Sequence, residues 1–281
     1  MTRLPALAAR LAFLLFVLST QVLADPPAYY FDFERTAEGA PFTRADWLVY
    51  GPAGVGFVQG PGRAITDSEH ARSGVQSIRV FYPASTVGPS EGGHQAALLL
   101  EPEREYCLSY WLRFGEDFSW GGSEQGGKLP GLGQGKLCSG GATCDGSNGF
   151  SARYMWREGG LAVLYLYHMD KPHKWGEDFT LLDSAGESFR FPRGEWIHLA
   201  QRVRINDGDT ADGEVQVWVN GNEALKLDGL RFVSDGSSID TFYFSTFHGG
   251  NTADWGPSND SYLWIDDIAV TDNVALCDAL K

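Results

Sequence analysis

Short runs rich in β-branched and aromatic residues recur along the chain, and many of them alternate apolar with polar positions. Gly, Pro, Asn or Asp bounds each run, which is typical of β-strands. The clearest runs are residues 29–33, 77–82, 106–114, 196–205, 215–219, 242–247 and 262–270. Helical periodicity is nearly absent after the first residues. This pattern predicts an all-β domain of two packed antiparallel sheets, a β-sandwich of the jelly-roll or the related concanavalin A-like lectin type.

The amino-terminal segment follows a different pattern. A basic start leads into an apolar run at residues 11–18, and Val22-Leu23-Ala24 presents small outer residues. This is the organisation of a signal peptide. We therefore expect residues 1–24 to be removed on export, leaving residues 25–281 as the single domain of a secreted or periplasmic protein. We expect no membrane association, because no run is long enough to anchor the chain in a bilayer.

The four cysteines all follow the signal segment. In an oxidising compartment an even number of cysteines predicts disulfide bonds, here two. Cys138 and Cys144 are close enough in sequence to close one loop, which leaves Cys107 to pair with Cys277. Three pairings are possible, and this one is favoured.

The charge is unevenly distributed. The chain has 22 Lys and Arg against 36 Asp and Glu, a net charge of −14. Residues 126–175 oppose this trend with six basic residues (Lys128, Lys136, Arg153, Arg157, Lys171 and Lys174) and three acidic ones (Asp145, Glu158 and Asp170). A solvated surface is one explanation. The other is a cationic groove for an anionic ligand. Nucleic acid is a poor candidate for that ligand and we expect none to bind, because the acidic remainder of the protein would repel a long polyphosphate.

A hairpin is predicted where residues 150–157 and 161–168 flank Glu158-Gly159-Gly160. If all three residues form the loop, Arg153 lies opposite Tyr165 and Ser151 opposite Tyr167, all on one face. A two-residue turn would instead move the tyrosines to the other face, since a one-residue slip exchanges the two faces.

A glycine-rich segment, residues 121–149, contains Gly126-Gly127-Lys128-Leu129-Pro130-Gly131. It imitates a phosphate-binding loop, but Leu129 stands where that motif requires Ser or Thr. We expect instead a mobile flap that brings Lys128 to the groove. Each of these residue types alone is commonly structural, so the prediction of a site depends on their coincidence.

The motifs Gly-Gly-Lys-Leu-Pro-Gly, Ser-x-Arg and Tyr-x-Tyr resemble polysaccharide lyase family 14, whose members are alginate and glucuronan lyases with a β-jelly-roll fold. The resemblance runs from about residue 106 to residue 267. It implies cleavage of a 1,4-linked uronate polymer by β-elimination. It also implies catalytic roles for five residues: Lys128, Ser151, Arg153, Tyr165 and Tyr167.

The chemistry of elimination needs these residue types. The proton at C5 lies beside a carboxylate, whose charge must be neutralised before the proton can leave. Arg153 can bind that carboxylate with two hydrogen bonds, and Lys128 can add a point charge. We expect both cations to lower the pKa of a neighbouring tyrosine, which makes a phenolate base accessible, while Lys128 stays open as an alternative base at high pH.

Stereochemistry limits which sugar the substrate can contain. The C5 hydrogen and the C4 oxygen lie on the same side of the ring in D-mannuronate and D-glucuronate, and on opposite sides in L-guluronate. A clustered Tyr165 and Tyr167 therefore favours polymannuronate or glucuronan. Candidate substrate-binding residues in the groove are Arg157, His173, Lys174, His248 and Trp255. We expect a monomer without a cofactor or metal, since the histidines show no metal-ligand spacing.

Two other functions stay open. A glycoside hydrolase on the same fold would need two carboxylates on the site face, and the predicted face carries neither Asp nor Glu. A non-catalytic carbohydrate-binding or lectin-like module would keep the sandwich but has little need for Lys, Arg and paired Tyr together.

Overall fold

The computed structural model describes residues 28–122, 126–250 and 252–279, so the expected signal peptide lies outside the described residues. One sheet contains β1 (Tyr29–Phe31), β3 (Ala64–Asp67), β4 (Ser77–Tyr82), β6 (Glu105–Phe114), β11 (Trp196–Arg204), β12 (Gly213–Val219), β13 (Asn222–Leu230) and β15 (Ser261–Thr271). The other contains β2 (Gly54–Gln59), β5 (His94–Glu103), β7 (Gly127–Gly133), β8 (Ser151–Trp156), β9 (Ala162–Tyr167), β10 (Glu177–Thr180) and β14 (Ile239–His248). The helical elements are short: α1 (Arg44–Leu48), α2 (Val274–Ala279), η1 (Pro61–Arg63), η2 (Glu158–Gly160) and η3 (Ala253–Trp255).

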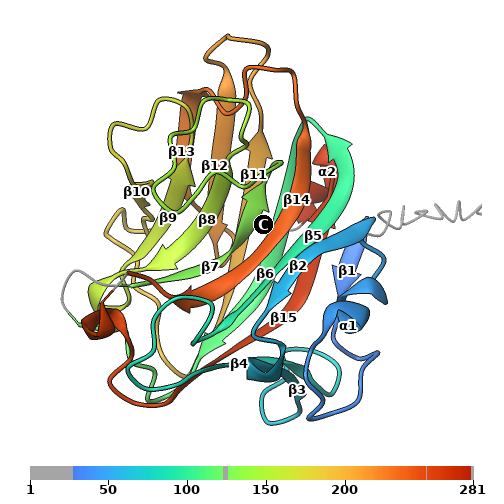
Figure 1. Ribbon diagram of the computed structural model, residues 1–281, viewed down its shortest axis with the longest axis vertical. Helices are drawn as coiled ribbons and strands as arrows, with labels where there is room; N and C mark the ends of the chain where they lie inside the picture. Colours follow the sequence, from blue (N-terminus) through green and yellow to red (C-terminus); the bar gives the residue numbers. More distant parts are fainter. Residues whose placement is uncertain (1–27, 123–125, 251, 280–281) are drawn as a thin grey trace, which may run out of the picture.

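The two sheets are antiparallel and stack as a sandwich (Figure 1). The first sheet has the order β13-β12-β11-β6-β15-β4-β3, with β1 paired to β15, and the second has the order β10-β9-β8-β7-β14-β5-β2. The predicted all-β jelly-roll sandwich is confirmed, and each of the seven predicted runs contains or overlaps a strand. Strands β7 to β9 lie next to one another within the second sheet, so this sheet collects the predicted site residues.

Large side chains fill the space between the sheets because alternate positions of each strand point inward. On β6 the inward residues are Tyr106, Leu108, Tyr110, Leu112 and Phe114, all essentially inaccessible to solvent. Each such residue contributes about 1.5–3 kcal/mol through burial of its apolar surface. The core thus fixes which residues of β8 and β9 face the opposite way, out of the sandwich.

Both predicted disulfide bonds are present. Cys107 on β6 is bonded to Cys277 on α2, and Cys138 is bonded to Cys144. The first bond ties the carboxyl-terminal helix to the first sheet. The second closes a loop just before β8.

The β8–β9 hairpin has the predicted three-residue loop, η2. Arg153 pairs with Tyr165 and Ser151 with Tyr167, so the predicted register is confirmed. Gly159 has a φ of 63°, a left-handed conformation that favours glycine. The register therefore places Arg153 and the two tyrosines on one face.

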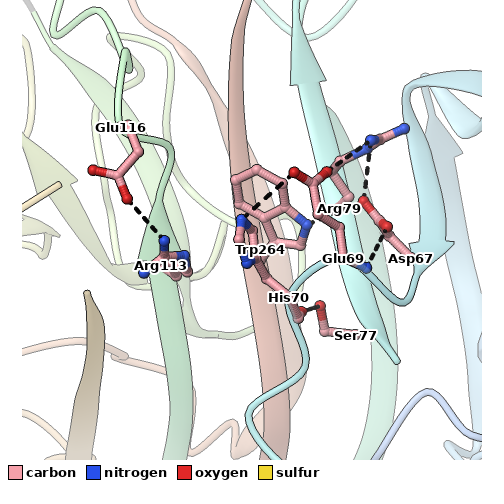
Figure 2. A network of polar contacts seen from close by, with 8 residues as sticks. All are labelled: Asp67, Glu69, His70, Ser77, Arg79, Arg113, Glu116 and Trp264. Atoms are coloured by element: carbon pink, nitrogen blue, oxygen red, sulfur yellow. Dashed lines mark hydrogen bonds and ion pairs between the residues drawn. The ribbon is translucent and has the colours of Figure 1, made fainter. Parts of the chain in front are cut away.

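The outward face of the first sheet carries a polar network in which three carboxylates surround two arginines (Figure 2). Arg79 lies 3.1 Å from the carboxylate of Asp67 and 3.8 Å from that of Glu69. Arg113 pairs with Glu116 at 3.0 Å. The arginines of this network are thus compensated by carboxylates. Within the described ranges, no helix is both apolar and long enough to cross a bilayer.

Candidate active site

A cleft of about 860 Å³ opens on the face of the second sheet that points away from the first. Six of the residues singled out in the sequence line it: Lys128, Arg153, Arg157, Tyr165, Tyr167 and Trp255. Alternation along the strands explains this placement, because the neighbours of Arg153 and Tyr165 in sequence lie in the core between the sheets. The cleft therefore brings most of the predicted site together.

Tyr165 and Tyr167 form a pair on β9. Their hydroxyl oxygens are 3.5 Å apart, and their rings pack edge to face with centroids separated by 5.4 Å. Each hydroxyl oxygen also accepts a hydrogen bond from a backbone N–H, from Gly176 at 3.1 Å for Tyr165 and from Gly141 at 3.0 Å for Tyr167. Two loops therefore hold the phenol oxygens in place.

The pKa of Tyr165 is raised above its ordinary value, first by burial and then by the neighbouring Tyr167. The Gly176 N–H and the charge of Arg157 lower it only in part. The prediction of a lowered tyrosine pKa is therefore wrong for Tyr165, because loss of water outweighs the nearby cations. This phenol keeps its proton and is suited to donate it.

Arg153 on β8 is 2% exposed, and its side chain contacts two neutral residues. Its Nη1 donates a hydrogen bond to Ser245 Oγ at 3.2 Å, and its Cζ lies 4.9 Å from the centre of the Tyr243 ring. The hydroxyls of Ser245 and Tyr243 both donate hydrogen bonds to Gln95 Oε1. The Nε2 of Gln95 in turn donates a hydrogen bond to Gln59 Oε1 at 3.0 Å. Among the described residues, no carboxylate pairs with Arg153, and its Nε has no hydrogen-bond partner. A buried, uncompensated guanidinium favours binding of an anion.

Arg157 lines the same cleft but is already paired. Its Nε and Nη2 each lie 2.8 Å from an oxygen of Asp178. Its Cζ is 5.4 Å from the centre of the Tyr165 ring. The charge of Arg157 is therefore compensated by Asp178, whereas that of Arg153 has no carboxylate partner among the described residues.

Lys128 lies on β7, with its Nζ 5.1 Å from the centre of the Tyr165 ring and 5.6 Å from that of Phe247. Its pKa is lowered to about 7, chiefly by burial of the ammonium group and then by the charges of Arg153 and Arg157. The side chain keeps some exposure to the cleft. Lys128 is consequently able to exchange a proton near neutral pH.

The expected mobile flap is wrong for the segment that carries Lys128. Residues 127–133 form a strand between β8 and β14, and a bulge in the pairing with β8 surrounds Pro130. The glycines serve close packing, since a Cβ added at Gly131 would lie 1.9 Å from the carbonyl oxygen of Ala152. The glycines that indicated a loop in the sequence are needed here because β7 packs closely against the main chain of β8.

Ser151 does not reach the cleft. It is fully buried, and its Oγ donates a hydrogen bond to the carbonyl oxygen of Cys138 at 2.9 Å. The residue implied to be catalytic therefore contacts the loop closed by the Cys138–Cys144 disulfide.

Three other expected substrate-binding residues lie outside the cleft. His173 and Lys174 are exposed, and their carbonyl oxygens each accept a hydrogen bond from Lys171 Nζ at 2.9 Å. His248 is 1% exposed and packs against Trp156 with ring centroids 5.1 Å apart. The expectation that His248 lines the groove is wrong, because Phe247 occupies the outward position of β14 and the next residue points inward.

Other residues that line the cleft were not identified from the sequence, among them Gln95, Trp175, Asp178, Arg190 and Tyr243. Tyr243 and Phe247 share one face of β14, so strand alternation could have indicated Tyr243. Gln95 reaches the site through the pairing of β5 with β14, where it lies opposite Ser245. A sequence alone does not specify that pairing.

No group of three or more His, Cys, Asp or Glu side chains within residues 28–122, 126–250 and 252–279 is arranged to hold a metal ion.

A β-sandwich whose open sheet face carries an arginine, a lysine and paired tyrosines has the make-up of a polysaccharide lyase. The family model of polysaccharide lyase 14 matches residues 70–268, more than half of the chain. The chain therefore belongs to polysaccharide lyase family 14 and is a polysaccharide lyase.

Similar solved structures share the fold. The alginate lyase Aly36B is 23% identical, with a TM-score of 0.73 over 89% of this chain and 98% of that one. The marine alginate lyase from Aplysia kurodai is 22% identical, with a TM-score of 0.69 over 88% and 99%. The endo-β-1,4-glucuronan lyase from the fungus Trichoderma reesei is 14% identical, with a TM-score of 0.54 over 87% and 95%. No curated protein matches the sequence.

Proposed function

We propose that this lyase cleaves 1,4-linked uronate polymers, polymannuronate or glucuronan, by β-elimination and leaves 4,5-unsaturated uronate ends. The observation that carries the proposal is Arg153, a buried guanidinium without a carboxylate partner among the described residues, in a cleft beside Lys128 and Tyr165. The similar structures, described as alginate and glucuronan lyases, support the same substrate class.

Arg153 binds the carboxylate of the sugar whose C5 proton is removed. Two hydrogen bonds from the guanidinium neutralise the carboxylate and stabilise the charge that develops on it as the proton leaves. The neutral partners Ser245 and Tyr243 hold Arg153 without competing for that charge.

Proton transfer is assigned from the two pKa shifts. Lys128, with a pKa of about 7, is the group that is unprotonated in mildly alkaline solution, so it accepts the C5 proton. Tyr165 retains its proton and gives it to the C4 oxygen as the C4–O bond breaks. The electrons of the C5–H bond form the C4–C5 double bond. The proton on Lys128 then returns to Tyr165 through solvent, which restores both groups.

The positions of these groups favour D-configured sugars. Lys128 Nζ lies over the Tyr165 ring, so acceptor and donor approach from one side. Removal of the C5 proton and departure of the C4 oxygen on the same side of the ring is the geometry of D-mannuronate and D-glucuronate.

We further propose that the protein is exported after removal of residues 1–24. The two disulfide bonds support an oxidising compartment.

The function is tested by incubating the protein with polymannuronate, polyguluronate and glucuronan and following the ultraviolet absorbance of the new double bond. We expect absorbance from the D-configured polymers. Faster cleavage of guluronate would contradict the stereochemical assignment. Reducing ends without absorbance would indicate a hydrolase, and binding without either signal would indicate a carbohydrate-binding module.

A further inference from the structure

The loop that the Cys138–Cys144 disulfide closes, residues 138–144, lies directly against the tyrosine pair. Both cysteines are buried, and they pack in one apolar cluster with Met155, Tyr165 and Tyr167 on the outward side of the sheet. We name this segment the disulfide loop. Its position makes it a wall of the site rather than a remote surface staple.

One backbone atom of the disulfide loop contacts the tyrosine pair. The N–H of Gly141 donates a hydrogen bond of 3.0 Å to Tyr167 Oη. Because this N–H occupies one acceptor position of the oxygen, the hydroxyl hydrogen of Tyr167 must point elsewhere. Tyr165 Oη, 3.5 Å away, is the neighbouring oxygen on β9. The loop thus sets the orientation of the Tyr167 hydroxyl beside Tyr165, the proposed proton donor.

The disulfide loop is itself anchored at its start by Ser151. The hydrogen bond from Ser151 Oγ to the carbonyl oxygen of Cys138 connects β8 to the loop, and Ser151 lies opposite Tyr167 in the hairpin register. A chain of contacts therefore runs from Ser151 through the loop to Tyr167. The bond between Cys138 and Cys144 closes this short segment and limits the conformations available to Gly141.

We propose that the Cys138–Cys144 disulfide, together with Ser151, positions Tyr167 through the Gly141 N–H, and that the rate of the elimination step depends on this bond. This inference rests on the proposed lyase function. Cys138, Cys144 and Ser151 are positioning residues, since they act through Tyr167 and do not line the part of the cleft where the proton moves.

The second disulfide supplies a matched control. Cys107 on β6 and Cys277 on α2 belong to the other sheet and its flanking helix, away from the tyrosine pair. Loss of this bond lowers stability without touching Tyr167. We expect Cys107→Ser/Cys277→Ser to lower the Tm while kcat at a permissive temperature stays within about twofold of the wild-type value.

The test is a mutant cycle with Tyr167→Phe. We expect Cys138→Ser/Cys144→Ser to lower kcat on the order of tenfold with KM within about twofold, since the hydrogen bond that holds Tyr167 beside the proton donor Tyr165 is lost. In the Tyr167→Phe background, removal of the same disulfide should cost no further activity. Ser151→Ala, which keeps the disulfide, should show the same dependence on Tyr167 if the double serine variant does not fold.

Equal losses in the wild-type and Tyr167→Phe backgrounds would overturn the proposal, and so would an unchanged kcat. A second measurement tests the positioning role independently of lyase activity. With ring-labelled tyrosine, the nuclear magnetic resonance signal of Tyr167, assigned by Tyr167→Phe, should shift in Cys138→Ser/Cys144→Ser and stay fixed in Cys107→Ser/Cys277→Ser. If the variant shows this shift but the wild-type protein cleaves no polyuronate, the positioning role stands and the proposed function is wrong. If the variant shows no shift, the positioning role is wrong.

Discussion

Lys128 on β7 and Tyr165 on β9 approach each other over the intervening strand β8, with the lysine Nζ 5.1 Å from the centre of the phenol ring. The lysine loses its proton more readily than usual and the phenol less readily. The pair is therefore matched for one group to accept a proton while the other donates one, as the proposed elimination requires.

The pH profile tests this assignment. Since the pKa of Lys128 is lowered to about 7, the fraction of unprotonated lysine rises through that pH. We expect kcat/KM, which reports groups of the free enzyme, to rise as the pH increases through about 7. Lys128→Arg keeps a positive charge throughout and should abolish this rise. A rate that instead falls through pH 7 would show that the lysine acts as a cation and that Tyr165 serves as both base and acid.

Lys128 should also make stability depend on pH. Its pKa is about 7 when folded and about 10.4 when unfolded, so between these values the unfolded chain binds more protons and stability rises with pH. We expect Lys128→Met to raise the Tm at pH 6 and to raise it much less near pH 10. Thermal unfolding at both pH values measures this. Lys136→Met, at an exposed position, is the control, and an equal gain at both pH values for Lys128→Met would argue against the lowered pKa.

The two arginines of the cleft should respond differently to substitution. Arg153→Lys removes the two-pronged donor from a site where no described carboxylate compensates it, and we expect kcat/KM to fall on the order of a hundredfold. Arg157→Lys disturbs a charge already paired with Asp178, and we expect a fall of less than about tenfold. Steady-state kinetics on polymannuronate compares them, and a larger effect at Arg157 would shift the carboxylate site to that residue.

Trp175 should contribute to polymer binding rather than to chemistry. It lines the cleft and is 54% exposed, so an indole face is accessible to a sugar ring. We expect Trp175→Ala to raise KM several-fold for long polymers and to leave kcat nearly unchanged, because stacking contributes equally to the ground and transition states. A fall in kcat with constant KM would instead assign Trp175 to positioning the neighbouring Gly176, whose N–H contacts Tyr165 Oη. Trp175→Phe, which keeps an aromatic ring, is the matched control.

Local patterns in the sequence predicted the strands and the hairpin well, because they depend on alternation and on the length of one loop. The facing of Arg153 and Tyr165 follows from the three-residue turn at residues 158–160 and from no distant contact. The disulfide pairing also followed from sequence spacing, since Cys138 and Cys144 are close together.

Features that depend on distant strands were missed or misassigned. Gln95 joins the site only because β5 lies beside β14, a pairing across more than 100 residues. The mobility expected for the Lys128 segment rested on its glycines, whose purpose is contact with β8. The sign of the Tyr165 pKa shift depends on burial, which is a property of the folded surroundings rather than of neighbouring residue types.

The close packing of β7 against β8 restricts how this lyase can be altered. Any side chain at Gly126 or Gly131 would overlap the main chain of the adjacent strand, with a Cβ only 1.9 Å from a carbonyl oxygen at either position. The depth and direction from which Lys128 enters the cleft are therefore set by the backbone and cannot be adjusted by mutation along its own strand. Engineering of substrate range is better begun at the rim of the cleft, where Trp175 lies in the loop between β9 and β10 and Trp255 lies in η3.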